Sequence, residues 1–159
     1  MTTVARHFVR LGARTAHCRI AGSGPALLLL HQSPQNSRMW LDLIERYAPR
    51  LTVIAPDTPG FGDSDPLADA QPGIADLAAA TLELADALGL ERFAVFGMHT
   101  GGLIGMQLAW AAPRRVAALI VDGFALFDAE ERAAMDARYL PPFVPSWDGA
   151  HLRWLWCRM

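Results

Sequence analysis

Short runs of consecutive apolar residues alternate along the chain with stretches in which apolar residues recur every three or four positions. Each run is typical of a strand that is buried on both faces of a sheet. The four runs lie at 26–30, 51–55, 93–96 and 116–121. Each periodic stretch predicts an amphipathic helix, and these stretches lie at 37–47, 74–88 and 101–112. This order predicts right-handed crossovers in a parallel sheet, with helices on both faces. Ser37 is the expected N-cap of the first helix.

The two ends of the chain depart from this alternation. Residues 7–11 and 15–20 alternate loosely between apolar and polar side chains around Gly12, which predicts an antiparallel hairpin. After the last apolar run, the pattern predicts a helix at 128–139 and a tryptophan-rich helical segment at 147–159. The sequence therefore predicts an α/β protein that opens with a hairpin and ends with helices outside the alternation.

Composition narrows the function classes. Hydrophobic residues make up 52% and charged residues 19% of the 159 positions, which predicts a folded domain with a substantial core. All fourteen basic residues are scattered arginines and the net charge is -2, so no basic face for nucleic acid or anionic membrane is expected. No apolar run approaches the roughly 18 residues that span a bilayer, and no secretion signal opens the chain. We expect a cytoplasmic, bacterial protein.

No cofactor or metal site is expected from the sequence. Cys18 and Cys157 form no metal-ligand spacing, and metal binding by His7 or His17 on the predicted hairpin is not expected. The glycines at 22–24 precede a strand rather than a helix, which argues against a phosphate-binding loop. We therefore expect a small-molecule substrate as the only ligand.

Unusual residues follow three of the predicted buried strands. These segments are His31-Gln32-Ser33-Pro34, the Gly/Pro/Asp-rich stretch 57–65, and Gly97-Met98-His99-Thr100-Gly101-Gly102. In open α/β sheets, ligands bind beyond the carboxyl ends of the strands. We therefore expect the functional site where these segments meet.

In this order and spacing, the three segments resemble the α/β-hydrolase superfamily. They match its oxyanion loop, its proline/glycine turn and its G-x-S-x-G elbow, and the resemblance runs from Phe8 to about Val121. It implies a partial α/β-hydrolase fold, with an incomplete core at 1–124 and the start of a helical lid at 125–159. Because intact members have two more strands, it also implies a truncated frame or a fragment, and self-association through the exposed sheet edge at 116–121.

His99 stands where the family carries its Ser, Cys or Asp nucleophile. The elbow is a sharp turn with positive φ, and the glycines at 97 and 101 provide the small neighbours that it needs. An imidazole at 99 could donate a hydrogen bond, act as a base or attack as a nucleophile. Alternatively, the elbow is a relic whose chemistry is lost. The acid and the late histidine of the family's triad are not among these residues.

The resemblance also implies roles for residues around the elbow. The backbone N–H groups of Ser33 and Thr100 match the two oxyanion donors. His31 and Gln32 are candidates for the substrate pocket, although His31 equally fits a structural role that braces its loop. Gln32 replaces a glycine of the family, so that the loop either loses a positive φ or gains an amide contact to substrate.

Three further residues have two interpretations each. Asp122 follows the last predicted strand, where it could orient an imidazole or simply form a turn with Gly123. Trp147 could line a substrate pocket or pack within the lid. Asp57 is expected to brace its own turn rather than take part in chemistry.

Three functions remain open at this point. The first is an α/β-hydrolase-fold enzyme that acts on a small ester, lactone or related carbonyl compound, with His99 at the reacting centre. The second is a non-hydrolytic lyase or cofactor-free oxygenase on the same scaffold, since a fold does not determine chemistry. The third is a catalytically inactive binding protein or fragment.

Overall fold

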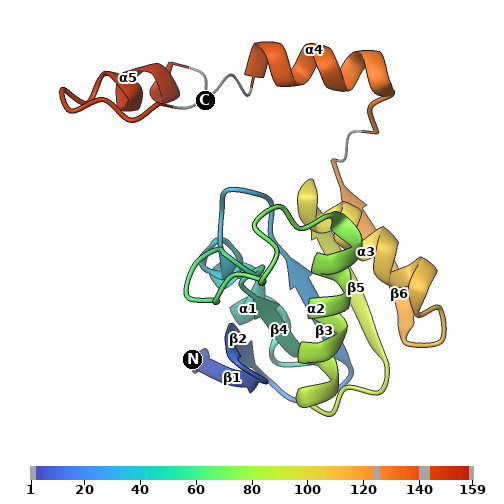
Figure 1. Cartoon of the computed structure of the whole chain (residues 1–159). Helices are drawn as coiled ribbons and strands as arrows, with labels where there is room; N and C mark the ends of the chain where they lie inside the picture. The colour runs from blue at the N-terminus through green and yellow to red at the C-terminus, as the bar shows by residue number, and fades with distance from the viewer. Residues whose placement is uncertain (1–2, 124–125, 140–143, 158–159) are drawn as a thin grey trace. The chain divides into compact units, whose positions relative to one another are not determined.

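The computed structural model describes residues 3–123, 126–139 and 144–157. Its contacts divide the chain into two compact units, Met1–Phe124 and Ala125–Met159. The first unit contains the sheet and its helices, and the second contains the last two helices (Figure 1). None of the helices in the described ranges is long and apolar enough to cross a membrane.

One six-stranded sheet forms the centre of the first unit. Its strands are β1 (Ala5–Leu11), β2 (Arg14–Ala21), β3 (Ala26–Leu30), β4 (Thr52–Pro56), β5 (Phe93–Met98) and β6 (Val116–Asp122). They lie in the order β1-β2-β4-β3-β5-β6, in which β2 is antiparallel to both neighbours and β3 to β6 are parallel. This confirms the partial α/β-hydrolase fold, a mostly parallel sheet with an N-terminal antiparallel hairpin.

Helices cover both faces of the sheet, as the alternation predicts. In the first unit these helices are the 3-10 helix η1 (Ser37–Trp40), α1 (Leu41–Tyr47), α2 (Ile74–Ala87) and α3 (Thr100–Ala111). The second unit contains α4 (Ala129–Tyr139) and α5 (Ala150–Trp156). Leu28 and Leu30 of β3 join one core cluster with α2 and α3, while Leu29 joins another with η1 and α1. Successive side chains of a strand point to opposite faces. The continuous apolar run therefore results from burial on both sides.

The predicted N-cap Ser37 is wrong, because Asn36 caps this helical segment. The Asn36 side chain accepts a hydrogen bond from the N–H of Arg38 at 3.0 Å. Ser37 is buried instead, and its own N–H donates to the carboxylate of Asp57 at 2.6 Å. The Ser37 N–H thus binds Asp57, the residue that directly follows β4.

β6 forms one edge of the sheet and pairs with β5 alone. Leu119 faces α3, where a methyl group on Gly105 would lie 2.9 Å from its Cδ1 atom. The neighbouring Ile120 is 62% exposed. Self-association through this edge stays a prediction.

Candidate active site

The chain turns sharply between β5 and α3 at His99. His99 has φ 47° and ψ −110°, and it is the only non-glycine residue in the described ranges with positive φ. This confirms the predicted elbow, with α3 beginning at Thr100. The side chain of His99 is exposed. The elbow therefore presents an imidazole at the carboxyl end of the parallel strands.

Two glycines allow the backbone to approach closely enough for this turn. A methyl group on Gly97 would overlap the carbonyl of Gly101, and one on Gly101 would overlap the carbonyl of Leu30 at the end of β3. No side chain fits at either position without a shift of backbone atoms. The first turn of α3 is thus held against the neighbouring strand.

The surroundings of His99 come largely from the end of β6. Its N–H donates to the carbonyl of Asp122 at 3.0 Å. A methyl group on Gly123, which has φ 59°, would lie 3.0 Å from Cε1 and 3.3 Å from Nε2 of the His99 ring. The structure thus places Asp122 beside His99 through the main chain. Within the described part of the chain, no hydrogen bond or ion pair reaches the His99 ring or joins it to the Asp122 carboxylate.

The 31–36 loop, which follows β3, is anchored by the buried side chain of His31. Its Nε2 accepts the N–H of Thr58 at 2.9 Å, so the proton is on Nδ1, which donates to the carbonyl of Gln32 at 3.0 Å. Burial lowers the pKa of His31 below its usual value, although the bond to Gln32 and the charge of Asp57 oppose this effect. Both ring nitrogens are thus occupied within the protein.

Gln32 and Ser33 continue this loop along the surface. Gln32 is half-buried and Ser33 is exposed, and the carbonyl of Gln32 also accepts the N–H of Gln35 at 2.8 Å. Since Gln32 has no positive φ, a side chain at this position strains no backbone. The substrate contact of Gln32 and the oxyanion role of Ser33 stay predictions.

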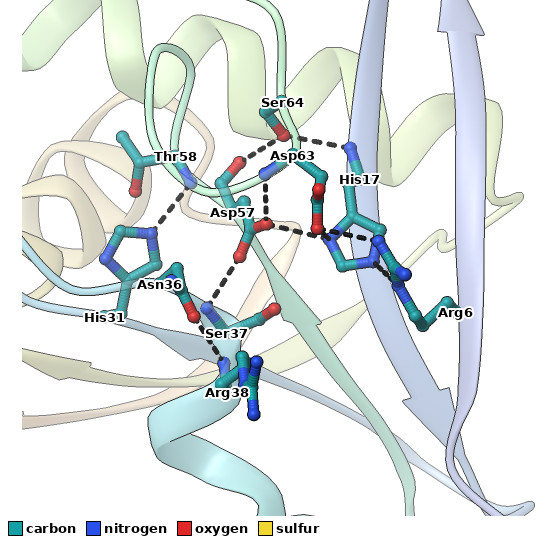
Figure 2. Close-up of polar contacts among 10 residues, drawn as sticks. All are labelled: Arg6, His17, His31, Asn36, Ser37, Arg38, Asp57, Thr58, Asp63 and Ser64. Carbon is teal, nitrogen blue, oxygen red and sulfur yellow. Dashed lines mark hydrogen bonds and ion pairs between the residues drawn. The ribbon is translucent and has the colours of Figure 1, made fainter.

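A buried network around Asp57 lies next to this loop (Figure 2). One carboxylate oxygen accepts the N–H of Ser37 at 2.6 Å. The other accepts Nδ1–H of His17 at 2.8 Å and the N–H of Asp63 at 2.9 Å. Burial raises the pKa of Asp57, but the hydrogen bonds from Asp63, Ser37 and His17 together bring it below its usual value. Asp57 is therefore a buried carboxylate that is ionised at neutral pH.

Arg6 of β1 completes the network from the surface. Its Nε donates to Nε2 of His17 at 3.1 Å, and its Nη2 contacts the carboxylate of Asp63 at 2.7 Å. Because a guanidinium can only donate, Nε2 of His17 must accept, and the proton on Nδ1 is directed at Asp57. The sequence did not predict this role of His17. Its one signal in the sequence is that His17 lies in a short predicted strand between the apolar residues Ala16 and Cys18.

The side chains of His17, Asp57 and Asp63 have the ligand types of a metal site and lie within 4.8 Å of one another. The Nδ1 proton of His17 already occupies the position of a metal ion between ring and carboxylate. The guanidinium of Arg6 supplies the positive charge beside them. The arrangement therefore fits a structural ion-pair network rather than a metal centre.

Trp147 belongs to the second unit, where its side chain is fully exposed. Its predicted place in a substrate pocket stays a prediction. Cys18 is buried and Cys157 is exposed, and both are free thiols.

The chain is similar in sequence to several known proteins. It is 36% identical over 136 residues to a fluoroacetate dehalogenase from Burkholderia, covering 80% of this chain and 44% of that protein. It is 34% identical over 110 residues to a soluble epoxide hydrolase from Corynebacterium, covering 69% and 38%. An uncharacterised protein of Mycobacterium tuberculosis is 43% identical over 104 residues, covering 65% and 30%.

The chain is also similar to solved structures. The epoxide hydrolase CorEH superimposes with a TM-score of 0.75 at 26% identity, covering 85% of this chain and 50% of that chain. A protein from Pseudomonas aeruginosa that is assigned as an epoxide hydrolase superimposes with a TM-score of 0.69 at 35% identity, covering 74% and 40%. This chain spans less than half the length of the relatives matched by sequence. The family model of the alpha/beta hydrolase fold matches residues 25–146, and the chain therefore belongs to that family.

Proposed function

We propose that this chain contains the reacting residue of an α/β-hydrolase-fold enzyme that acts on a small ester, lactone or related carbonyl compound. The observation that carries this proposal is the exposed His99 imidazole at a positive-φ elbow. A side chain that is held at a strained backbone position, at the carboxyl end of parallel strands, is typical of a reacting group. The similarity to a fluoroacetate dehalogenase and to epoxide hydrolases supports a small-molecule substrate.

The chemistry available to His99 is nucleophilic. In its unprotonated form, one ring nitrogen attacks the acyl carbon, and the bond to the leaving oxygen breaks with its electron pair. The alcohol or phenol departs with a proton. Water then cleaves the acyl-imidazole and releases the carboxylic acid, which regenerates the ring. The backbone N–H groups of Ser33 and Thr100 are the proposed donors to the negative oxygen of the transition state.

A second candidate is a protein on this scaffold that binds the same compounds without hydrolysing them. It is favoured because, within the described ranges, no carboxylate or second imidazole forms a hydrogen bond or ion pair with the His99 ring. A general base normally requires such an orienting partner. A lyase or oxygenase on the same fold remains the third alternative.

The test measures acyl transfer from p-nitrophenyl acetate to the full chain. Mass spectrometry of the intact protein and of its peptides should detect one acetyl group on His99, with release of p-nitrophenol. The variant His99→Ala should lose both signals, while His7→Ala, which removes an exposed imidazole from β1, should retain them. Equal acetylation and release in wild type and His99→Ala would refute the proposal. Ester hydrolysis that appears only in His99→Ser would support the binding protein instead.

A further inference from the structure

We propose that Asp57 is a positioning residue that holds the 31–36 loop, and with it the N–H of Ser33, in place beside the elbow. The inference rests on the proposed function for the role of the Ser33 N–H. The holding of the loop itself follows from contacts that are independent of any reaction.

Two adjacent residues that directly follow β4 hold both ends of this loop (Figure 2). At one end, the N–H of Thr58 donates to His31 Nε2 at 2.9 Å. At the other end, the carboxylate of Asp57 accepts the N–H of Ser37 at 2.6 Å. The loop is thus attached at its first residue and directly after its last, through groups that follow one another in the chain. A shift of Asp57 therefore moves both attachment points.

The Asp57 carboxylate is itself fixed in position. Asp57 is 3% exposed, and its second oxygen is occupied by His17 Nδ1 and by the N–H of Asp63. Its carbonyl accepts the hydroxyl of Ser64 at 2.8 Å, and that hydroxyl also accepts the N–H of His17 at 2.9 Å. Hydrogen bonds to a charged acceptor are stronger than those between neutral groups. Rotation of the carboxylate would leave several buried donors without partners, which is costly.

The loop that Asp57 holds begins against the elbow. A methyl group on Gly101 would overlap the carbonyls of Leu30 and His31, so the first turn of α3 and the start of the loop lie too close together to admit a side chain between them. Ser33 follows two residues after His31, and Thr100 directly precedes Gly101. The separation of their N–H groups therefore depends on how the loop lies on this turn. Transition-state donors must hold their positions within about half an ångström to be effective.

Arg6 extends this arrangement to the surface. Its Nε donates to His17 Nε2 at 3.1 Å, which fixes the tautomer whose Nδ1–H bonds to Asp57. The Arg6 side chain is 47% exposed, so its removal creates no cavity in the core. A substitution at Arg6 therefore weakens the hydrogen bonds around Asp57 without changing a buried residue, and it tests the same inference with less risk of unfolding.

The experiment compares full-length Asp57→Asn and Arg6→Met with wild type by amide hydrogen exchange, read residue by residue by NMR. Asp86→Asn is the matched control, because it makes the same chemical change in an exposed carboxylate of α2, which pairs with Arg115. In Asp57→Asn, the Ser37 and Thr58 amides should exchange at least about tenfold faster relative to those of β3 and β5. Arg6→Met should accelerate the same amides to a smaller extent, and Asp86→Asn should leave them unchanged.

A second measurement uses the acetylation of His99. If Asp57 positions the Ser33 donor, Asp57→Asn should lower the kcat of p-nitrophenyl acetate turnover about tenfold while KM stays within about twofold. Absence of acetylation in wild type would contradict the proposed function alone, since the exchange measurement still tests the holding of the loop. Unchanged relative exchange of Ser37 in Asp57→Asn would overturn the inference. If Asp57→Asn fails to fold, unchanged exchange in Arg6→Met would overturn it.

Discussion

The backbone at residue 99 predicts that glycine is more stabilising there than alanine, which reverses the usual order. His99 has φ 47° and ψ −110°, a region that residues with a Cβ atom rarely adopt and that costs on the order of 1–3 kcal/mol. Glycine adopts this region without that cost. His99→Gly removes both the ring and the Cβ atom, whereas His99→Ala removes the ring and keeps the strained Cβ. The difference between the two variants therefore isolates the backbone strain.

The expected difference can be worked out from two opposing terms. Relief of strain favours glycine by about 1–3 kcal/mol. The greater freedom of glycine in the unfolded chain favours alanine by about 0.4–1 kcal/mol. His99→Gly should therefore be more stable than His99→Ala by about 1 kcal/mol. At an unstrained, exposed position in the middle of a helix, such as Ala79 of α2, glycine should instead be less stable than alanine by about 1 kcal/mol.

Urea unfolding followed by tryptophan fluorescence measures both differences, because the midpoint shifts while the slope stays constant when only stability changes. Trp40 is buried in the hydrophobic core between η1 and the sheet, so its fluorescence reports on unfolding. Ala79→Gly against wild type is the control. A His99→Gly variant that is less stable than His99→Ala, in the same direction as the control, would refute the strained elbow.

Three further outcomes follow from the described geometry. Burial raises the pKa of the Cys18 thiol to about 12, so a thiol reagent at pH 8 should modify Cys157 alone until urea unfolds the protein, as counted by mass spectrometry. Burial lowers the pKa of His31, so on acidification the unfolded state binds the proton first. Stability should therefore fall as the pH drops below about 6.5, less so in His31→Asn, as measured by urea midpoints. Gly101→Ala places a methyl group on the Leu30 carbonyl and should cost at least about 2 kcal/mol in urea unfolding. A midpoint equal to that of wild type would contradict this close contact.

The sheet and the elbow could be predicted because each has a local signal in the sequence. Strands that are buried on both faces must be apolar throughout, so the run at 26–30 identifies β3 without knowledge of its neighbours. The turn at His99 requires small residues two positions away on either side, and Gly97 and Gly101 satisfy that requirement. In both cases the cause lies within a few residues of its effect.

The network around Asp57 could not be predicted in the same way. His17 and Asp57 are 40 residues apart in sequence and meet only because β2 pairs with β4. A histidine in a hairpin strand and an aspartate after another strand are each ordinary by themselves. The cap at Asn36 was missed for a similar reason. The N–H of Ser37 binds Asp57, which lies 20 residues further along the chain, while the N–H of Arg38 binds Asn36. Contacts between residues that are far apart in the sequence leave no periodic pattern in it.

The bend before α3 owes its shape to the glycines that surround residue 99 rather than to the side chain at 99. The His99 residue is exposed, and the tight fit involves the backbone of Gly97, Gly101 and Leu30. The shape of the turn therefore does not depend on which side chain residue 99 carries. The turn should therefore keep its shape when the side chain at 99 is replaced, whether or not His99 has the reactivity proposed for it.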